Sequence, residues 1–202
     1  PPTLLERAQR RNHRQRDHDV VRRVGGSSII VVLNQVADAA LMVAHRQGVV
    51  HRDVKPSNVI LDREGAAYLM DFGIAKVVGV SGDLTATGAA IGTPAYMAPE
   101  QAAADPQIDH RADIYAVGVV AYELLTGRPP FTGTTQQEIL AAQVTQAAEP
   151  VTKYRDSVPP ALEQLVLKCL EKKAADRWQT AEELLPHLEE IGRAVQQECR
   201  DR

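Results

Sequence analysis

The stretch His51-Arg52-Asp53-Val54-Lys55-Pro56-Ser57-Asn58 decides how this sequence of 202 residues is interpreted. It brings an aspartate, a lysine and an asparagine together where the regular pattern on either side is broken. Before it, apolar residues recur at helical spacing from Ile29 to Ala44, and Gly48 is placed to end that helix. After it, residues 58–62 and 67–70 favour two strands joined by a glycine-containing turn. The stretch is therefore expected to be a loop between a helix and a small β-hairpin.

The rest of the sequence predicts a mainly helical chain. Residues 73–108 are rich in Gly, Thr, Ala and Pro, which indicates a long functional loop. Asp113 to Leu125 is apolar nearly all round and predicts a buried central helix. Thr180 to Glu183 predicts a capping box that opens a final helix, with Pro186 expected to kink it. Further expected elements are a β-rich stretch at 49–50 and helices at 135–146, 160–173 and 181–191.

Composition indicates a globular protein. Hydrophobic residues make up 44% and charged residues 24% of the sequence. The apolar run Ile29 to Leu33 is too short to cross a bilayer, so no membrane segment is expected in this chain. Cys169 and Cys199 show neither metal-ligand spacing nor a disulfide framework. These features favour a cytoplasmic location.

The first residues differ in composition from the remainder. Residues 1–26 contain seven arginines and three acidic residues. They have no aromatic residue to stack on bases and no regular apolar face, so nucleic-acid binding is not expected. The predicted organisation is a basic, disordered or unrelated leader at 1–27, a domain at 28–191 and a polar tail at 192–202.

Four further motifs follow the opening stretch in a fixed order. They are Asp71-Phe72-Gly73, Gly92-Thr93-Pro94-Ala95-Tyr96-Met97-Ala98-Pro99-Glu100, Asp113-Ile114-Tyr115-Ala116-Val117-Gly118 and Ala175-Asp176-Arg177. With residues 51–58, they resemble the catalytic loop, metal-binding turn, substrate-side anchor, central helix and arginine turn of eukaryotic-type (Hanks-type) bacterial serine/threonine protein kinases. Five ordered motifs are far more specific than one. The resemblance covers about residues 28–191 and implies the large C-terminal lobe of the kinase fold, mainly α with a small β-hairpin region.

The resemblance implies ATP-dependent phosphoryl transfer, which depends on positioning and charge stabilisation. Asp53 is the candidate base that accepts the proton of the substrate hydroxyl. Lys55 is expected to reach the transferring phosphoryl group. Asn58 and Asp71 supply hard oxygen ligands suited to Mg²⁺, with Mn²⁺ as an alternative. Small-molecule phosphotransferases share a similar loop but lack the anchor and the arginine turn.

The same resemblance assigns the nucleotide and the acceptor. Ser57 and Ile60 join the ATP site, Ile60 as the apolar floor under adenine. Lys55, together with Gly-Thr in the substrate loop, implies serine or threonine acceptors in protein substrates. Thr93 would hydrogen-bond Asp53 and Lys55 and shape the acceptor pocket.

Several family positions are architectural. His51 and Phe72 resemble packed core positions rather than proton-transfer groups. Asp113 is expected to accept hydrogen bonds from the amides of the catalytic loop. Glu100 and Arg177 resemble a buried ion pair that ties the end of the long loop to the helical body.

Arg52, beside Asp53, implies control by phosphorylation. In the family, such an arginine is neutralised by a phosphorylated residue of the activation loop. Thr85 and Thr87 are the candidates, with two ordinary exposed threonines as the alternative.

The sequence lacks the small-lobe motifs of the family. It has no GxGxxG before the catalytic loop, and Lys55 is its first lysine. Three explanations stay open: a fragment or mis-started product of a complete kinase, a half-enzyme that borrows a small lobe or kinase partner in trans, and a non-catalytic binding or decoy module. The chain alone is expected to be poorly active.

Overall fold

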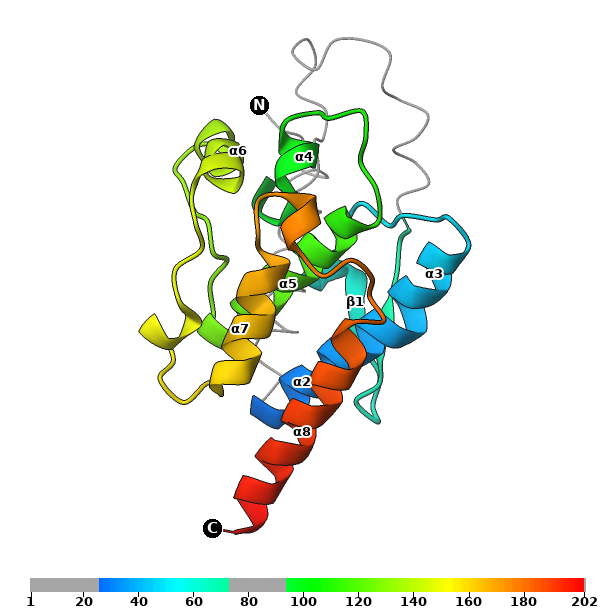
Figure 1. Ribbon diagram of the computed structural model, residues 1–202, viewed down its shortest axis with the longest axis vertical. Helices are drawn as coiled ribbons and strands as arrows, with labels where there is room; N and C mark the ends of the chain where they lie inside the picture. The colour runs from blue at the N-terminus through cyan, green and yellow to red at the C-terminus, as the bar shows by residue number, and fades with distance from the viewer. Residues whose placement is uncertain (1–25, 73–93, 202) are drawn as a thin grey trace, which may run out of the picture.

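The computed structural model describes residues 26–72 and 94–201, which form a mainly helical body with one small sheet (Figure 1). The predicted leader up to residue 25 lies outside the described residues. A continuous helical stretch comes first, made of α2 (Gly26–Gln35), the wider π-helical η1 (Val36–Met42) and α3 (Val43–Arg46). It confirms the helix expected from the apolar spacing.

The helix ends differently from the expected strand at 49–50. Gly48 adopts a left-handed φ of 72°. Its amide donates to the carbonyl of His45 at 2.9 Å, and the Val49 amide donates to Ala44 at 2.9 Å. These two bonds satisfy the last carbonyls of the helix in a Schellman motif. The strand prediction was wrong because the backbone of this stretch closes a helix and pairs with no strand among the described residues.

The predicted hairpin is confirmed. Strands β1 (Val59–Leu61) and β2 (Ala67–Leu69) pair antiparallel, with Ile60 opposite Tyr68. Gly65 supplies the turn with a φ of 88°. Side chains alternate, so that one face of the hairpin is buried and the face of Ile60 and Tyr68 is exposed.

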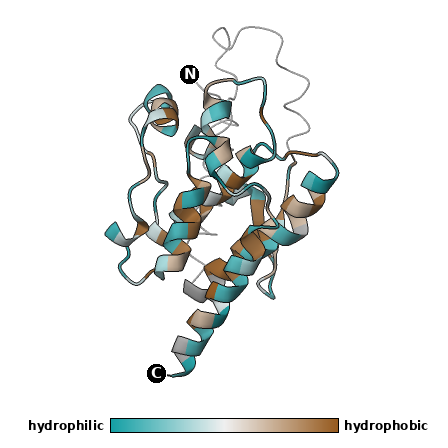
Figure 2. Cartoon of the chain, in the orientation of Figure 1, coloured by the Kyte–Doolittle hydropathy of each residue, from teal (hydrophilic) through white to brown (hydrophobic). Residues whose placement is uncertain are grey.

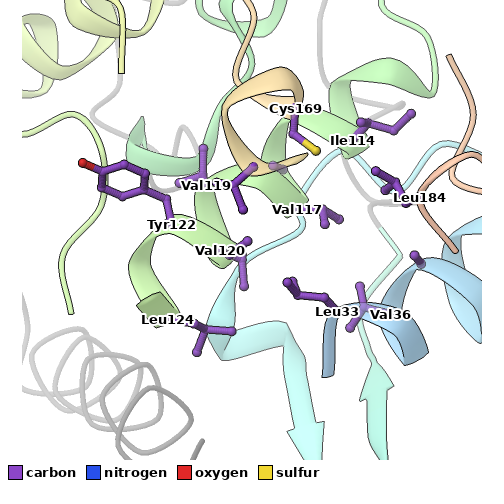
Figure 3. Packing of buried hydrophobic residues seen from close by; sticks show 14 of the residues in the cluster. Leu33, Val36, Ile114, Val117, Val119, Val120, Tyr122, Leu124, Cys169 and Leu184 are labelled. Carbon is purple, nitrogen blue, oxygen red and sulfur yellow. The ribbon is translucent and has the colours of Figure 1, made fainter. Parts of the chain in front are cut away.

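The predicted central helix is α5 (Arg111–Thr126), in which 13 of 16 residues are buried. Figure 3 shows Val117 and Val120 directed toward Leu33 of α2, with Cys169 and Leu184 nearby. Helix α5 runs close to α7 (Pro160–Cys169), which ends before the expected residue 173. Residues 170–173 leave the α-helix and lead to the short 3₁₀ helix η6 (Ala174–Asp176).

The last helix, α8 (Leu184–Arg200), begins later and ends later than expected, and the stretch predicted as a polar tail lies mostly inside it. Pro186 falls in its first turn, where no amide donor is needed, so the predicted kink has no cause. The Thr180 hydroxyl accepts the Glu183 amide as the capping box requires, but the Glu183 carboxylate accepts from the amide of Gln179. These two hydrogen bonds therefore stabilise a turn at residues 179–183, just before α8 begins.

The other elements lie around α5. They are η2 (Pro56–Asn58), η4 (Pro94–Tyr96), α4 (Pro99–Ala102), α6 (Gln136–Thr145) and η5 (Val151–Lys153). Helix α8 crosses α2 in Figure 1. Figure 2 shows apolar residues where these helices meet and mainly polar residues toward the end of α8.

One helical stretch, Ile29–Arg46, is long and apolar enough by composition to cross a membrane, although no membrane segment was expected. Its buried residues belong to the hydrophobic core: Ile29, Ile30, Val32, Leu33, Val36, Ala37 and Leu41. A core helix passes the same test of length and composition, and packing against α8 and α5 accounts for the apolarity of this one.

Candidate active site

The loop at residues 51–58 is anchored to the start of α5. Asp113 is 1% exposed, and its two carboxylate oxygens accept the amides of His51 at 2.8 Å and Arg52 at 2.7 Å. A ring nitrogen of His45 lies 2.9 Å from the same carboxylate. Arg52 holds a left-handed φ of 63°, which is costly for a residue with a side chain. The bonds at Asp113 hold the loop in this conformation, which is the arrangement that the resemblance implied for Asp113.

His51 joins the loop to the end of the hairpin. Its Nε2 lies 2.9 Å from the carbonyl of Met70, and its Nδ1 accepts the amide of Asp53 at 3.2 Å. This pattern puts the proton on Nε2, since a carbonyl can only accept. The ring also packs on Phe72 with centroids 4.6 Å apart. Both ring nitrogens are thus engaged, in keeping with a packed position.

Asp53, Lys55 and Asn58 form one hydrogen-bonded group. Lys55 Nζ donates to Asp53 Oδ2 at 2.9 Å, and both side chains remain partly accessible, 15% for the lysine and 21% for the aspartate. The buried Asn58 donates its Nδ2 to the Asp53 carbonyl at 2.8 Å. Because the amide nitrogen of Asn58 faces Asp53, its oxygen is the atom that can bind a cation.

Asp71 lies beside Asn58 because the hairpin brings their backbones together. The Met70 amide donates to the Asn58 carbonyl at 2.8 Å, which extends the pairing one step past β1 and β2. Asp71 follows directly, exposed and with a φ of 58°. Among the described residues no group of three or more His, Cys, Asp or Glu could hold a metal. A cation between Asn58 and Asp71 would therefore take its other ligands from phosphates and water.

The exposed face of the hairpin forms an apolar strip next to these residues. Ile60, Tyr68 and Met70 are 47%, 54% and 46% exposed. Ile60 and Tyr68 are cross-strand partners, and Met70 follows two residues later, so all three share a face. The proposed adenine floor, Ile60, belongs to this strip, and the half-buried Ser57 precedes it in η2.

Glu100 and Arg177 form a buried ion pair, as the resemblance implied. Two parallel bonds of 2.7 Å join the guanidinium to the carboxylate, and the arginine side chain is completely buried. Its remaining donors reach the carbonyls of Arg111, Glu171 and Lys172 at 2.9, 2.7 and 3.0 Å. All five N–H donors of Arg177 are therefore satisfied.

Some predicted residues lie outside the described part of the chain, namely Thr85, Thr87 and Thr93. Within residues 26–72 and 94–201, no acidic side chain forms an ion pair with Arg52. Gln101 was not singled out from the sequence. It donates Nε2 to the Arg52 carbonyl at 3.0 Å and accepts the Ala98 amide at 3.0 Å, so it joins α4 to the loop.

Comparison with known proteins identifies the family of this chain. The protein kinase domain model matches residues 10–188, beginning inside the segment that the motif resemblance did not cover. Serine/threonine-protein kinase PknB of Mycobacterium tuberculosis is 39% identical over 173 residues, which are 84% of this chain and 28% of that protein. A probable serine/threonine-protein kinase of Streptomyces coelicolor is 42% identical over 151 residues, 74% of this chain and 22% of that protein.

A probable serine/threonine-protein kinase of Corynebacterium efficiens is 38% identical over 201 residues, 96% of this chain and 30% of that protein. The chain thus spans less than a third of the length of these relatives. The ordered motifs, the helical fold and the domain match agree, and this chain belongs to the protein kinase domain family, with bacterial serine/threonine kinases among its relatives.

Proposed function

We propose that this protein transfers the γ-phosphate of ATP to serine or threonine hydroxyls of protein substrates. The observation that carries the proposal is the group formed by Asp53, Lys55 and Asn58. The carboxylate of Asp53 is held by Lys55 at 2.9 Å while part of it stays accessible. A charge held in place before reaction costs little reorganisation during it.

The residues present fit Mg²⁺ and ATP. Asn58 and Asp71 offer an amide and a carboxylate oxygen on adjacent backbone segments, the donor chemistry that Mg²⁺ prefers. When bound, ATP supplies the phosphoryl group and Mg²⁺ neutralises charge on its phosphates. Ile60 would contact the base, and Ser57 lies between the catalytic loop and that strand.

In the proposed step, Asp53 orients the substrate hydroxyl and accepts its proton. The hydroxyl oxygen forms a bond to the γ-phosphorus as the bond to the β,γ-bridging oxygen breaks, and ADP leaves with that electron pair. Lys55 stabilises negative charge on the transferring group. The rigid attachment of the loop to Asp113 keeps Asp53 in position. Since ATP is supplied in the cytoplasm, the proposed activity places the site there.

We propose that a second body encloses the nucleotide. No lysine precedes Lys55 in the sequence, so the small-lobe lysine that pairs the phosphates in the family has no counterpart in these 202 residues. The apolar strip of Ile60, Tyr68 and Met70 is a surface that such a body would cover. We therefore propose that the 202 residues alone transfer phosphate slowly, and that a small lobe supplied in cis or in trans restores the rate.

Regulation belongs to the same proposal. Arg52 lies beside Asp53 without an ion-pair partner among the described residues, and phosphorylation of Thr85 or Thr87 would supply one. Mass spectrometry of the active protein should find phosphate on at least one of these threonines. Replacing both with alanine should slow substrate phosphorylation without lowering the melting temperature, and an unmodified, fully active protein would contradict this.

The test of function uses labelled ATP, Mg²⁺ and a general protein substrate. The 202-residue chain is compared with the same chain joined to the small lobe of the Mycobacterium tuberculosis relative. We expect phosphoserine and phosphothreonine from the joined protein and little product from the chain alone. No transfer by the joined, folded protein would refute the proposal, and tight binding to an intact kinase in that case would support a decoy role.

A further inference from the structure

Gln143 is a buried polar residue that neither the motifs nor the proposed mechanism explains. Among the described residues, five polar or charged residues are buried: His51, Asn58, Asp113, Gln143 and Arg177. His51 and Asn58 belong to the catalytic loop, Asp113 anchors that loop, and Arg177 pairs with Glu100. Gln143 is 0% exposed on α6, a helix whose other glutamines face solvent. Burying an amide is costly unless its hydrogen bonds are satisfied, so its partners are informative.

The partners of Gln143 lie in the substrate-side segment. Its Nε2 donates to the carbonyl of Ala95 at 2.7 Å and to that of Pro94 at 3.2 Å. These residues form η4, directly after Thr93 in the sequence. One side chain from a helix nearly fifty residues away thus satisfies two carbonyls of an irregular segment.

The orientation of the Gln143 amide is fixed by its other contact. Its Oε1 accepts the hydroxyl of Tyr115 at 2.5 Å, and the oxygen of Tyr115 accepts from Lys172 Nζ at 3.2 Å. An ammonium group can only donate, which makes the tyrosine oxygen the acceptor and leaves its proton for Gln143. The amide nitrogen must then face Pro94 and Ala95. The Lys172 ammonium therefore fixes the direction of every hydrogen bond from Lys172 through Tyr115 to Gln143.

Lys172 connects this chain of bonds to the rest of the lobe. Its Nζ also donates to the Gln143 carbonyl at 2.7 Å and lies 3.8 Å from the centroid of the Phe131 ring. Its own carbonyl accepts from the buried Arg177 guanidinium. The network is thus continuous with the ion pair of Glu100 and Arg177, which holds the far end of the same segment.

We infer that Gln143 is a positioning residue for the acceptor side of the site, fixing Pro94 and Ala95 of the substrate-side segment at residues 94–100 for binding of the protein substrate. This inference rests on the proposed function. Loss of the amide donors would leave the segment with more conformations, of which few suit the acceptor peptide. Affinity for the protein substrate would fall, whereas ATP and the group around Asp53 are contacted by other residues.

The decisive variants are Gln143→Met, which removes the amide, and Gln143→Glu, which keeps the acceptor for Tyr115 but removes both donors. Gln137→Met is the matched control, because Gln137 is an exposed glutamine of the same helix. In the joined protein, both Gln143 variants should raise the KM for a peptide substrate about tenfold, the effect of losing one to two hydrogen bonds, with kcat and the KM for ATP within about twofold. The control should change none of these.

Hydrogen exchange on the 202-residue chain supplies a readout that does not depend on activity. Amides of residues 95–102 should exchange faster in both Gln143 variants, and those of α5 should not. Tyr115→Phe, which keeps the ring and frees the amide to turn, should give a smaller change in the same direction. If a Gln143 variant fails to fold, the Tyr115→Phe variant still tests the inference by hydrogen exchange.

The outcomes separate the two proposals. An active joined protein whose peptide KM is unchanged by Gln143→Met would overturn the role of Gln143 and leave the function standing. A wild-type joined protein without activity would refute the function, and unchanged exchange in the variants would then refute the positioning role by itself.

Discussion

Replacing Arg177 with methionine should be among the most destabilising single changes in this lobe. The side chain is completely buried and makes two 2.7 Å bonds to Glu100. Methionine is similar in length but leaves the carboxylate, which is 15% exposed, without its partner. Three backbone carbonyls also lose a donor. Breaking one side of a buried pair costs about 3–5 kcal/mol, a large part of the roughly 5–15 kcal/mol that stabilises a domain.

The chain offers a matched control in Arg46 and Glu182. This pair has a similar distance, 2.6 Å, but its side chains are 66% and 40% exposed. Exposed pairs contribute about 0–1 kcal/mol, so Arg46→Met should have little effect. The contrast tests burial and not the presence of an arginine–glutamate pair.

Urea unfolding followed by tryptophan fluorescence measures both changes. Trp178 is the only tryptophan, and it adjoins Arg177, with its indole N–H on the Leu165 carbonyl at 3.2 Å. The urea midpoint of the Arg177 variant should fall while the slope of the transition stays the same. A loss of less than about 1 kcal/mol, no greater than in the Arg46 control, would refute the reasoning about the buried pair.

Three further predictions concern α5 and Lys172. Asp113→Asn should speed hydrogen exchange at the amides of His51 and Arg52, which donate to this carboxylate. The change should lower the free energy of unfolding by about 1–3 kcal/mol, because the new NH₂ group faces one of those donors. Unchanged protection of the two amides would contradict this. Gly118→Ala should destabilise by about 1–3 kcal/mol in urea, since a Cβ there would lie 2.5 Å from Cβ of Cys169, and a neutral result would show that α5 and α7 separate easily. Burial, followed by the charge of Arg177, lowers the pKa of Lys172 to about 8 from 10.5, so the folded chain binds fewer protons than the unfolded chain between these values. Stability in urea should therefore rise from about pH 8 toward pH 10 relative to Lys172→Met, and a falling difference would contradict the assignment.

The site was largely accessible from the sequence because its residues belong to short, ordered motifs. The spacing of residues 51–58 and of Asp71 placed the loop and the hairpin, and the hairpin pairing then brought Asn58 and Asp71 together. The anchoring of the loop by Asp113 and the pairing of Glu100 with Arg177 also followed from the motif resemblance. These long-range contacts were predicted only because the ordered motifs resemble those of a known family.

Other contacts depend on tertiary packing that no local pattern encodes. Helix α6 contains three glutamines, and nothing in their spacing tells which one is buried; Gln143 is distinguished only by the approach of η4 and α5. The same holds for Gln101 on α4. The valines at 49–50 have high strand propensity, but the Val49 amide donates to the Ala44 carbonyl in the Schellman motif at Gly48. The need to satisfy the last carbonyls of the helix outweighed the strand propensity of these valines.

The most direct test of the central claim is the rate of phosphate transfer by the joined protein carrying Asp53→Asn, at saturating ATP and Mg²⁺. The substitution preserves size and should leave the fold and the melting temperature intact. It removes the group proposed to accept the substrate proton, so the rate should fall about 10²–10⁴-fold, the usual contribution of general-base catalysis. A variant that retains its rate within about threefold of the wild type would contradict the assignment of Asp53, and with it this account of the site.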